Sequence, residues 1–299
     1  MLQSSIQKAN HVKQKISSRS KSSGWKLFKR NKIGMIGLCI LLIMFFIAAA
    51  AQWIMPFDPL AQDVVNRAKG PSSDHLFGTD PFGRDILSRV ILGSQTSLLV
   101  GVLSVLFSTL IGVAIGMVSA FKGGLLDDIL MRILDSIMMI PMLLFGMMVL
   151  VALGSSMSTL IIVISIALIP NVARVARGTT LEIKEKEYIK AAISMGSGSW
   201  RIILRQIFPN ILGPLLVITT LNMSTAIRVE ASLSFIGVGV QPPTPTWGNM
   251  IQEGFQYIAA TPGLVIYPGI FLIIVSIAFN LVGDVIRDAF DPHLKQQRK

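Results

Sequence analysis

Few residues of this chain have the types and spacing that enzyme chemistry requires. Its three histidines, His11, His75 and His293, are far apart and form no His-Glu-x-x-His pattern, so a histidine-rich metal site is not expected. The chain contains no Gly-x-x-x-x-Gly-Lys-Ser/Thr loop to bind ATP phosphates and no Gly-x-Ser-x-Gly elbow to activate a serine. We therefore predict that the chain has no catalytic residues and binds neither a metal nor a nucleotide.

Two charged residues, Arg228 and Glu230, fall at the outer end of an otherwise apolar run. Ionisable groups are costly within a membrane and mark pathways or gates there. We therefore expect these two residues to belong to a gate or a translocation path. Residues two positions apart on a helix do not face each other, so no direct pair between them is expected.

A second polar group lies between the first two apolar runs. Its members Asp80, Arg84 and Asp85 either hold an outer loop through ion pairs or receive a partner protein, and the sequence leaves both alternatives open. Trp247 follows the turn-rich stretch 241–246. It is predicted to be an outer-loop residue, and an anchor at the membrane–water interface rather than a platform for a substrate.

Membrane-spanning helices must position these residues. The chain of 299 residues is 52% hydrophobic and 14% charged, whereas a soluble domain has about a quarter charged residues. A helix needs about 20 apolar residues to cross a membrane, so the charge-poor windows predict an all-α integral membrane protein with six transmembrane helices. We expect the spans at 33–55, 94–120, 131–153, 157–173, 210–230 and 263–283.

Glycine and proline predict local features of these spans. Gly112 and Gly116 have the spacing that allows two membrane helices to approach closely. Pro141 is expected to kink the third span. The stretch 232–262 is broken by glycine and proline and is predicted to be an extracytoplasmic loop.

The basic residues indicate the orientation of the chain. The net charge is +11, and most of the 27 lysines and arginines lie in the first 32 residues, in the segment 174–205 and at the C-terminal end. Six spans put these segments on one side, so the positive-inside rule predicts that both termini are cytoplasmic. Orientation and contact with anionic lipid headgroups account for the charge, and nucleic acid is not an expected partner.

The largest predicted cytoplasmic loop contains a polar stretch, residues 187–209, between two apolar runs. Apolar and small residues follow helical spacing from Ile189 to Gly196 and again from Trp200, with glycine and serine in between. This pattern predicts a short amphipathic helix-turn-helix. Such a unit either docks on another protein or lies on the inner headgroups, and spacing alone does not decide between the two.

The polar stretch resembles the cytoplasmic loop of ATP-binding-cassette (ABC) importer permeases. The family pattern reads Glu-Ala-Ala, three residues, Gly, nine residues, Ile, one residue, Leu-Pro. This chain matches the pattern at Ala191, Ala192, Gly196 and Pro209. It departs from the pattern at Lys190, Gln206 and Phe208, and its acidic residue is displaced to Glu187. The segments 75–89, 241–251 and 280–292 are similar to the C-type subunit of dipeptide/oligopeptide (and nickel/glutathione) importers.

The resemblance implies a type I ABC importer permease fold in the bacterial cytoplasmic (inner) membrane. It implies that ATPase subunits couple to the chain through Glu187, Ala191, Ala192, Gly196 and Pro209. The implied partners are a B-type permease subunit, two cytoplasmic ATPase subunits, an extracytoplasmic substrate-binding protein and membrane lipid. ATP and Mg would be bound by the ATPase subunits, so this chain is expected to bind no cofactor and to catalyse no reaction.

The implied organisation has four parts. They are a basic cytoplasmic tail (1–32), a first transmembrane helix with an extracytoplasmic segment (33–93), a permease core (94–285) that contains the coupling loop 174–209, and a cytoplasmic C-terminal tail (286–299). Short peptides are the expected cargo. The first alternative is the same scaffold importing nickel, a metallophore or glutathione. The second is an ion-coupled secondary transporter, which predicts ionisable groups in mid-span, whereas nearly all charges here are expected at span ends or in loops.

Overall fold

The computed structural model of the chain describes residues 31–290, so most of the two predicted tails, 1–32 and 286–299, lies outside the described residues. The described part is helical, with one isolated β-bridge between Thr79 and Asp85, and the predicted all-α class is confirmed. Its elements are α2 (Lys32–Ala49), α3 (Ala51–Ile54), α4 (Ile86–Lys122), α5 (Gly124–Met138), α6 (Met142–Leu153), α7 (Met157–Lys184), α8 (Glu187–Ser194), α9 (Ser199–Ile202), the π-helix η1 (Ile203–Ile207), α10 (Phe208–Ile236), α11 (Trp247–Gln256) and α12 (Gly263–Phe290).

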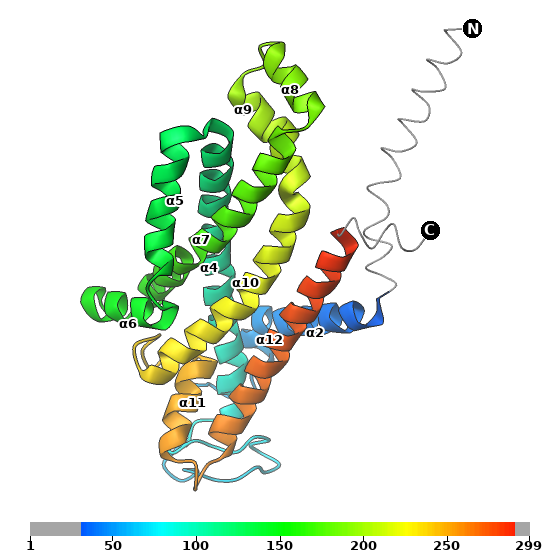
Figure 1. Ribbon diagram of the computed structural model, residues 1–299. Coiled ribbons are helices and arrows are strands. Elements are labelled where there is room, and N and C mark those ends of the chain that lie inside the picture. The colour runs from blue at the N-terminus through cyan, green and yellow to red at the C-terminus, as the bar shows by residue number, and fades with distance from the viewer. Residues whose placement is uncertain (1–30, 291–299) are drawn as a thin grey trace.

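Helices α4 and α10 run along most of the length of the molecule, α7 packs against α4 toward one end and α12 packs against α10 toward the other, and α2 crosses α12 in this view (Figure 1). Helices α8 and α9 lie at one end. The segment between α3 and α4 lies at the other end, together with α11. We call the end that contains α8 and α9 the tip end, and the end that contains α11 the outer end.

Within residues 31–290, five helices are long and apolar enough to cross a membrane, and the bent pair α5 and α6 brings the number to six if the pair is one span. The two members of this pair meet at an angle of 87°. Pro141 lies at the break, as the N-cap of α6, where its missing N–H and fixed φ end one helix and start the next. The predicted kink is therefore a complete break.

Helix α4 begins earlier than the predicted second span. Asp85 caps it by accepting a hydrogen bond from the Ser88 N–H at 2.8 Å, so the helix starts at Ile86 and the predicted boundary between 93 and 94 falls inside it. Charged and polar residues do not end the helix here, because Ser88 and Arg89 are buried against the segment 55–85 between α3 and α4, which we call the outer segment. Helix α10 likewise continues past 230, as far as Ile236, where Gly237 adopts a left-handed φ of 95°.

Helices α4 and α7 pack closely. A Cβ placed on Gly112 would lie 2.8 Å from the Cβ of Val172, and one placed on Gly116 would lie 2.4 Å from the carbonyl oxygen of Ala173. Only glycine permits backbones to approach this closely, so the predicted packing role of the two glycines is confirmed.

The stretch predicted as an outer loop contains a helix, α11. The Thr246 hydroxyl accepts from the Asn249 N–H, and the Asn249 side chain accepts in return from the Thr246 N–H, which completes a capping box. With 10 residues the helix is too short to span a membrane, and it packs against α4, α10 and α12 at the outer end. The prediction that this stretch does not span holds, and the prediction that it is a loop was wrong.

Candidate functional site

The predicted helix-turn-helix is present at the tip end (Figure 1). Helix α8 begins at Glu187 and ends at Ser194, and Gly196 follows with φ +74°. In this left-handed conformation, the Gly196 N–H bonds to the Ile193 carbonyl at 2.9 Å and the Ser197 N–H to the Ala192 carbonyl at 3.0 Å. Gly196 therefore turns the chain from α8 into α9, a task for which most side chains are strained.

The residues predicted to couple to a partner do not all face the same way. Ile189 and Ala192 are buried beneath α8, whereas Glu187, Ala191 and Gly196 are exposed. Ala192 is therefore not available for docking, and its small size serves the packing of α8. This corrects the expected surface role of Ala192.

The exposed side of the tip end is apolar. Its large side chains are Tyr188, Ile193, Met195, Trp200 and Leu204. We call these five residues the apolar tip. Met195 is 79% exposed and Trp200 is 65% exposed, which is unusual for side chains of this size on a polar loop. Such a surface fits a groove of another protein or a lipid layer.

Charges surround the apolar tip. Lys186, Lys190 and Arg205 are exposed and close to it in the sequence, as are Glu182, Glu185 and Glu187. The Lys190 ammonium lies 2.7 Å from Glu185 and holds the pKa of that carboxyl below its ordinary value. The tip therefore offers charges of both signs around an apolar centre.

Helix α9 leads into α10 through the π-helix η1. Pro209 lies in the first turn of α10, and its missing N–H removes one of the bonds that would continue the α-helical ladder. Pro209 is exposed, and single π-helical turns of this kind are frequent at functional sites. The structure thus assigns Pro209 a part in shaping the link between the tip and α10.

Polar contacts connect the tip to the bundle. The Lys184 ammonium, at the end of α7, donates to the carbonyl oxygens of Ala120 at 3.2 Å and Phe121 at 2.7 Å, at the end of α4. About two turns before Lys184 on α7, the Arg177 guanidinium donates two hydrogen bonds to the Asp127 carboxylate of α5, at 2.7 and 2.6 Å. These contacts join α7, which leads into α8, to α4 and α5.

At the outer end, two arginines and two acids form a buried network. Arg84 contacts Asp80 at 2.5 Å and Glu253 at 2.9 Å, and Arg89 contacts Asp80 and, at 2.9 Å, Glu253. Asp80 and Arg89 are almost completely buried. The network holds the outer segment to α4 and α11. Of the two alternatives left open by the sequence, Asp80 and Arg84 therefore follow the first, in which ion pairs hold an outer loop. As buried groups, they are not exposed to a docking protein.

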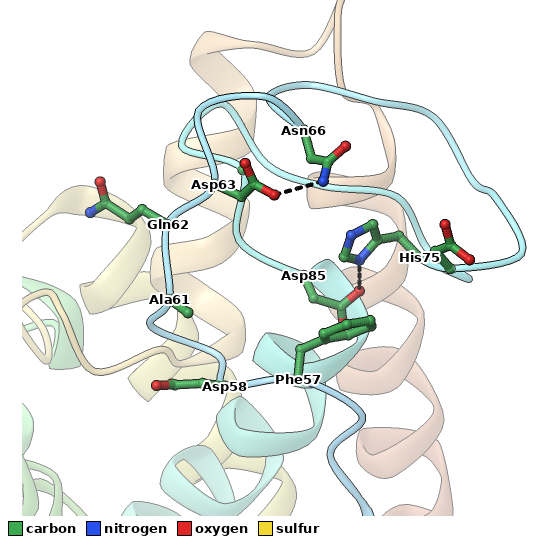
Figure 2. Close-up of a pocket in the computed structure, with 10 residues that line it drawn as sticks. Phe57, Asp58, Ala61, Gln62, Asp63, Asn66, His75 and Asp85 are labelled. Atoms are coloured by element: carbon green, nitrogen blue, oxygen red, sulfur yellow. Dashed lines mark hydrogen bonds and ion pairs between the residues drawn. The ribbon is translucent and has the colours of Figure 1, made fainter.

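Asp85 belongs to a separate cluster in the same segment. Its carboxylate accepts from the Ser88 hydroxyl at 2.7 Å and lies 2.9 Å from Nδ1 of His75. Asp85 and His75 border a cavity of about 560 Å³ that is lined mostly by the stretch 57–66 (Figure 2). On the far side of it, the backbone N–H of Val65 and the Asn66 side chain lower the pKa of Asp63. Asp85 is thus a structural residue that joins the loop to α4.

Trp247 is completely buried. Its indole N–H donates to the Val90 carbonyl of α4 at 3.2 Å, and its backbone N–H donates to the Ser97 hydroxyl at 3.2 Å. The expectation of an interfacial anchor was wrong, because the capping box turns Trp247 toward α4 rather than toward the membrane surface.

Arg228 and Glu230 do not pair and face different surroundings. Glu230 is completely buried, and its carboxylate accepts from the Ser234 hydroxyl at 2.8 Å. Arg228 is exposed and donates to the hydroxyls of Ser224 and Thr225. The two residues do not mark the outer end of the fifth span, because α10 continues beyond them to Ile236.

Three residues of these networks were not identified from the sequence. Arg89 and Glu253 complete the outer network, and His75 pairs with Asp85. The available signal was the excess of charge in 80–89 next to an apolar span, which requires partners for buried groups. Among residues 31–290, no three His, Cys, Asp or Glu side chains are grouped as a metal site would require.

Comparison with family models gives two matches. The model described as "Binding-protein-dependent transport system inner membrane component" matches residues 112–296. The model described as "N-terminal TM domain of oligopeptide transport permease C" matches residues 22–71.

Curated relatives cover most of the chain. The oligopeptide transport system permease protein OppC of Bacillus subtilis is 38% identical over 95% of this chain and 94% of its own length. The glutathione transport system permease protein GsiD of Pectobacterium atrosepticum is 38% identical over 91% and 90%. The dipeptide transport system permease protein DppC of Alkalihalophilus pseudofirmus is 36% identical over 91% and 89%.

The fold also matches a solved structure. A chain of the MetNI methionine ABC transporter in an inward-facing conformation superposes with a TM-score of 0.56 and 18% identity, over 69% of this chain and 98% of that chain. At this identity the match concerns the fold alone.

Proposed function

Because this chain belongs to the family of binding-protein-dependent transport system inner membrane components, as a C-type permease of an ABC importer, we propose that its cargo is short peptides. The relatives named for oligopeptides and dipeptides support this cargo. A relative named for glutathione makes that tripeptide the second candidate. Nickel and metallophores stay as alternatives on the same scaffold.

The ATPase subunits dock at the exposed turn at Gly196 and at the neighbouring apolar tip. The tip presents large apolar side chains on a polar loop, and a groove in an ATPase subunit would bury them. Glu187 and Ala191 lie on the exposed side of α8, while Ala192 supports the helix from below. Pro209 shapes the connection to α10.

The mechanism follows from the contacts of the tip. ATP binding closes the ATPase dimer and displaces α8, and α7 carries the displacement to α4 and α5 through Lys184 and Arg177. The spans then tilt and open the path outward, and hydrolysis resets them inward. Such coupling requires that nucleotide and cargo prefer different conformations of one two-state element. ATP and Mg are bound by the ATPase subunits, and this chain catalyses no reaction itself.

The tip end is cytoplasmic in this proposal, together with both termini. Its basic residues support that orientation by the positive-inside rule. The partners are a B-type permease subunit, two ATPase subunits and a substrate-binding protein on the outer side of a bacterial inner membrane. Membrane lipid covers exposed apolar side chains such as those of α2, namely Ile33, Ile36, Leu42, Ile43 and Phe46.

Reconstitution of the whole importer in lipid vesicles tests the proposal. We expect uptake of radiolabelled trialanine that requires ATP and the binding protein, and that persists when the proton gradient is collapsed. Parallel assays with glutathione and with nickel measure the alternatives. Uptake of nickel or glutathione without uptake of trialanine would reject the peptide cargo. Uptake that requires the proton gradient and no ATPase subunits would reject the coupling.

A further inference from the structure

Arg228 lies at the middle depth of the membrane-spanning bundle. The hydroxyl of its neighbour Ser224 donates to the Ser276 carbonyl at 3.1 Å, and Ser276 lies in the middle of α12. At 1.5 Å per residue, it is about 20 Å from either end of that helix. Arg228 in turn donates to the Ser224 hydroxyl. The guanidinium is therefore level with the centre of a span.

The surface around Arg228 differs from the lipid-facing surfaces of the chain. The exposed positions of α12 nearest this level are both isoleucines, Ile273 and Ile277. On α10, the partly exposed neighbours of Arg228 at helical spacing are Thr225 and Ser232. A polar stripe with a cation at mid-span faces a water-filled path or another subunit rather than lipid.

The guanidinium has capacity for an anion. No carboxylate of residues 31–290 forms an ion pair with Arg228, and its described partners are the two hydroxyls of Ser224 and Thr225. A guanidinium has five N–H donors in a planar fork that matches a carboxylate, so donors remain for a bidentate contact. The two hydroxyls hold the side chain toward the N-terminal side of its own turn, which fixes the fork in place before any ligand arrives.

We propose that Arg228 is a carboxylate-binding subsite of the translocation path and takes the C-terminal carboxylate of the transported peptide. The inference rests on the proposed peptide cargo. Every linear peptide with a free C-terminus presents this group whatever its side chains. A single mid-path cation can therefore recognise peptides of different sequence.

The buried residue Glu230 supports the assignment by contrast. It lies two residues away, on the other side of α10, with Ser97 of α4 and Thr246, the N-cap of α11, beside it. Its carboxyl accepts a hydrogen bond from Ser234 on its own helix, and within residues 31–290 it forms no ion pair with Arg228. The positive charge at the exposed face stays available to an anion.

The test compares two probes in the reconstituted importer. Trialanine and trialanine amide differ in the terminal carboxylate, and each is supplied on saturated binding protein so that the path rather than the capture step is compared. We expect the wild-type importer to transport the acid about tenfold faster than the amide, as the loss of a charge-assisted hydrogen bond predicts. Arg228→Gln should lower the acid rate to that of the amide and change the amide rate less than about twofold.

Two further variants complete the design. Arg228→Lys keeps the charge without the fork and should give an intermediate ratio of acid to amide. Ile277→Val, on the lipid-facing side of α12 near the same depth, should leave both rates unchanged. An equal loss for both probes in Arg228→Gln would overturn the subsite, and so would equal wild-type rates. Loss of the copurifying permease partner would instead assign Arg228 to a carboxylate of that partner and overturn the subsite. Failure of the wild type to import either probe would reject the peptide cargo itself.

Discussion

Gly116 of α4 lies directly against Ala173 of α7, where a Cβ on the glycine would be 2.4 Å from the alanine carbonyl oxygen. The backbone of Ala173 cannot yield as a flexible side chain would. Gly116→Ala should therefore force the two helices apart at a cost of about 1–3 kcal/mol. Thermal unfolding in detergent measures this as a lower Tm. Gly178→Ala is the matched control on α7, because nothing lies within 4 Å of its added Cβ. A Tm equal in both variants would contradict the packing account.

The Arg177–Asp127 pair should transmit motion between α7 and α5. Arg177→Ala is expected to lower peptide uptake more than ATP hydrolysis, because the ATPase subunits still dock at α8. The exchange Arg177→Asp with Asp127→Arg should restore part of the uptake. A double-mutant cycle measures the coupling, which for residues in direct contact is about 0.5–3 kcal/mol. Strictly additive effects of the two single variants would remove this pair from the transmission path.

Removing one acid from the buried network of Asp80, Arg84, Arg89 and Glu253 should strongly lower the free energy of unfolding. Asp80→Asn leaves Arg84 and the buried Arg89 without a full counter-charge, and breaking a buried ion pair in this way costs about 3–5 kcal/mol. Thermal unfolding should show the loss, and limited proteolysis should cut the segment 57–85 faster than in the wild type. Asp58→Asn serves as an exposed control. An unchanged proteolysis pattern in Asp80→Asn would contradict the assigned role of the network.

The stabilising contribution of the ion pair between Glu185 and Lys190 should decrease only at acidic pH. Because the folded pKa of Glu185 is lowered, the contribution of the pair is fully present above the ordinary carboxyl value and is lost as the pH falls through the lowered one. Binding of the ATPase subunits should therefore not change through this pair between about pH 8 and pH 6. The measurement is copurification across that range, with Glu185→Gln for comparison. A change in the wild type that Glu185→Gln abolishes would contradict this assignment.

Much of the fold could be predicted because apolar spans and their breaks follow from local composition. The break at Pro141 and the close approach at Gly112 and Gly116 depend on single residues with few conformational alternatives. The extent of α4 and α10 could not be predicted from hydropathy. Charged residues such as Arg89 ordinarily end a span, and here long-range partners bury them within the helix.

The candidate sites were predictable only in part. Periodicity identified α8 and Gly196, but it did not distinguish Ala191, which is exposed, from Ala192, which is buried, because that depends on how α8 lies on the bundle. The sequence predicts an interfacial position for Trp247, whereas the structure buries it. The capping box that turns Trp247 inward depends on two polar residues, Thr246 and Asn249, which leave no apolar periodicity to reveal it. Contacts across many residues, such as Arg84 with Glu253, leave no local pattern in a single sequence.

The most direct measurement of the central claim is the amount of ATPase that copurifies with the complex when Gly196 is replaced. Gly196→Arg places a long charged side chain beside the apolar tip and strains a backbone at φ +74°. Gly196→Asn tolerates this φ, and Gly198→Arg adds the same side chain at an ordinary φ of −61°. We predict that Gly196→Arg lowers both copurifying ATPase and trialanine uptake at least about tenfold, the scale of losing a central interface contact, while Gly196→Asn retains most of each. Normal copurification together with normal uptake in Gly196→Arg would contradict docking of the ATPase subunits at this turn.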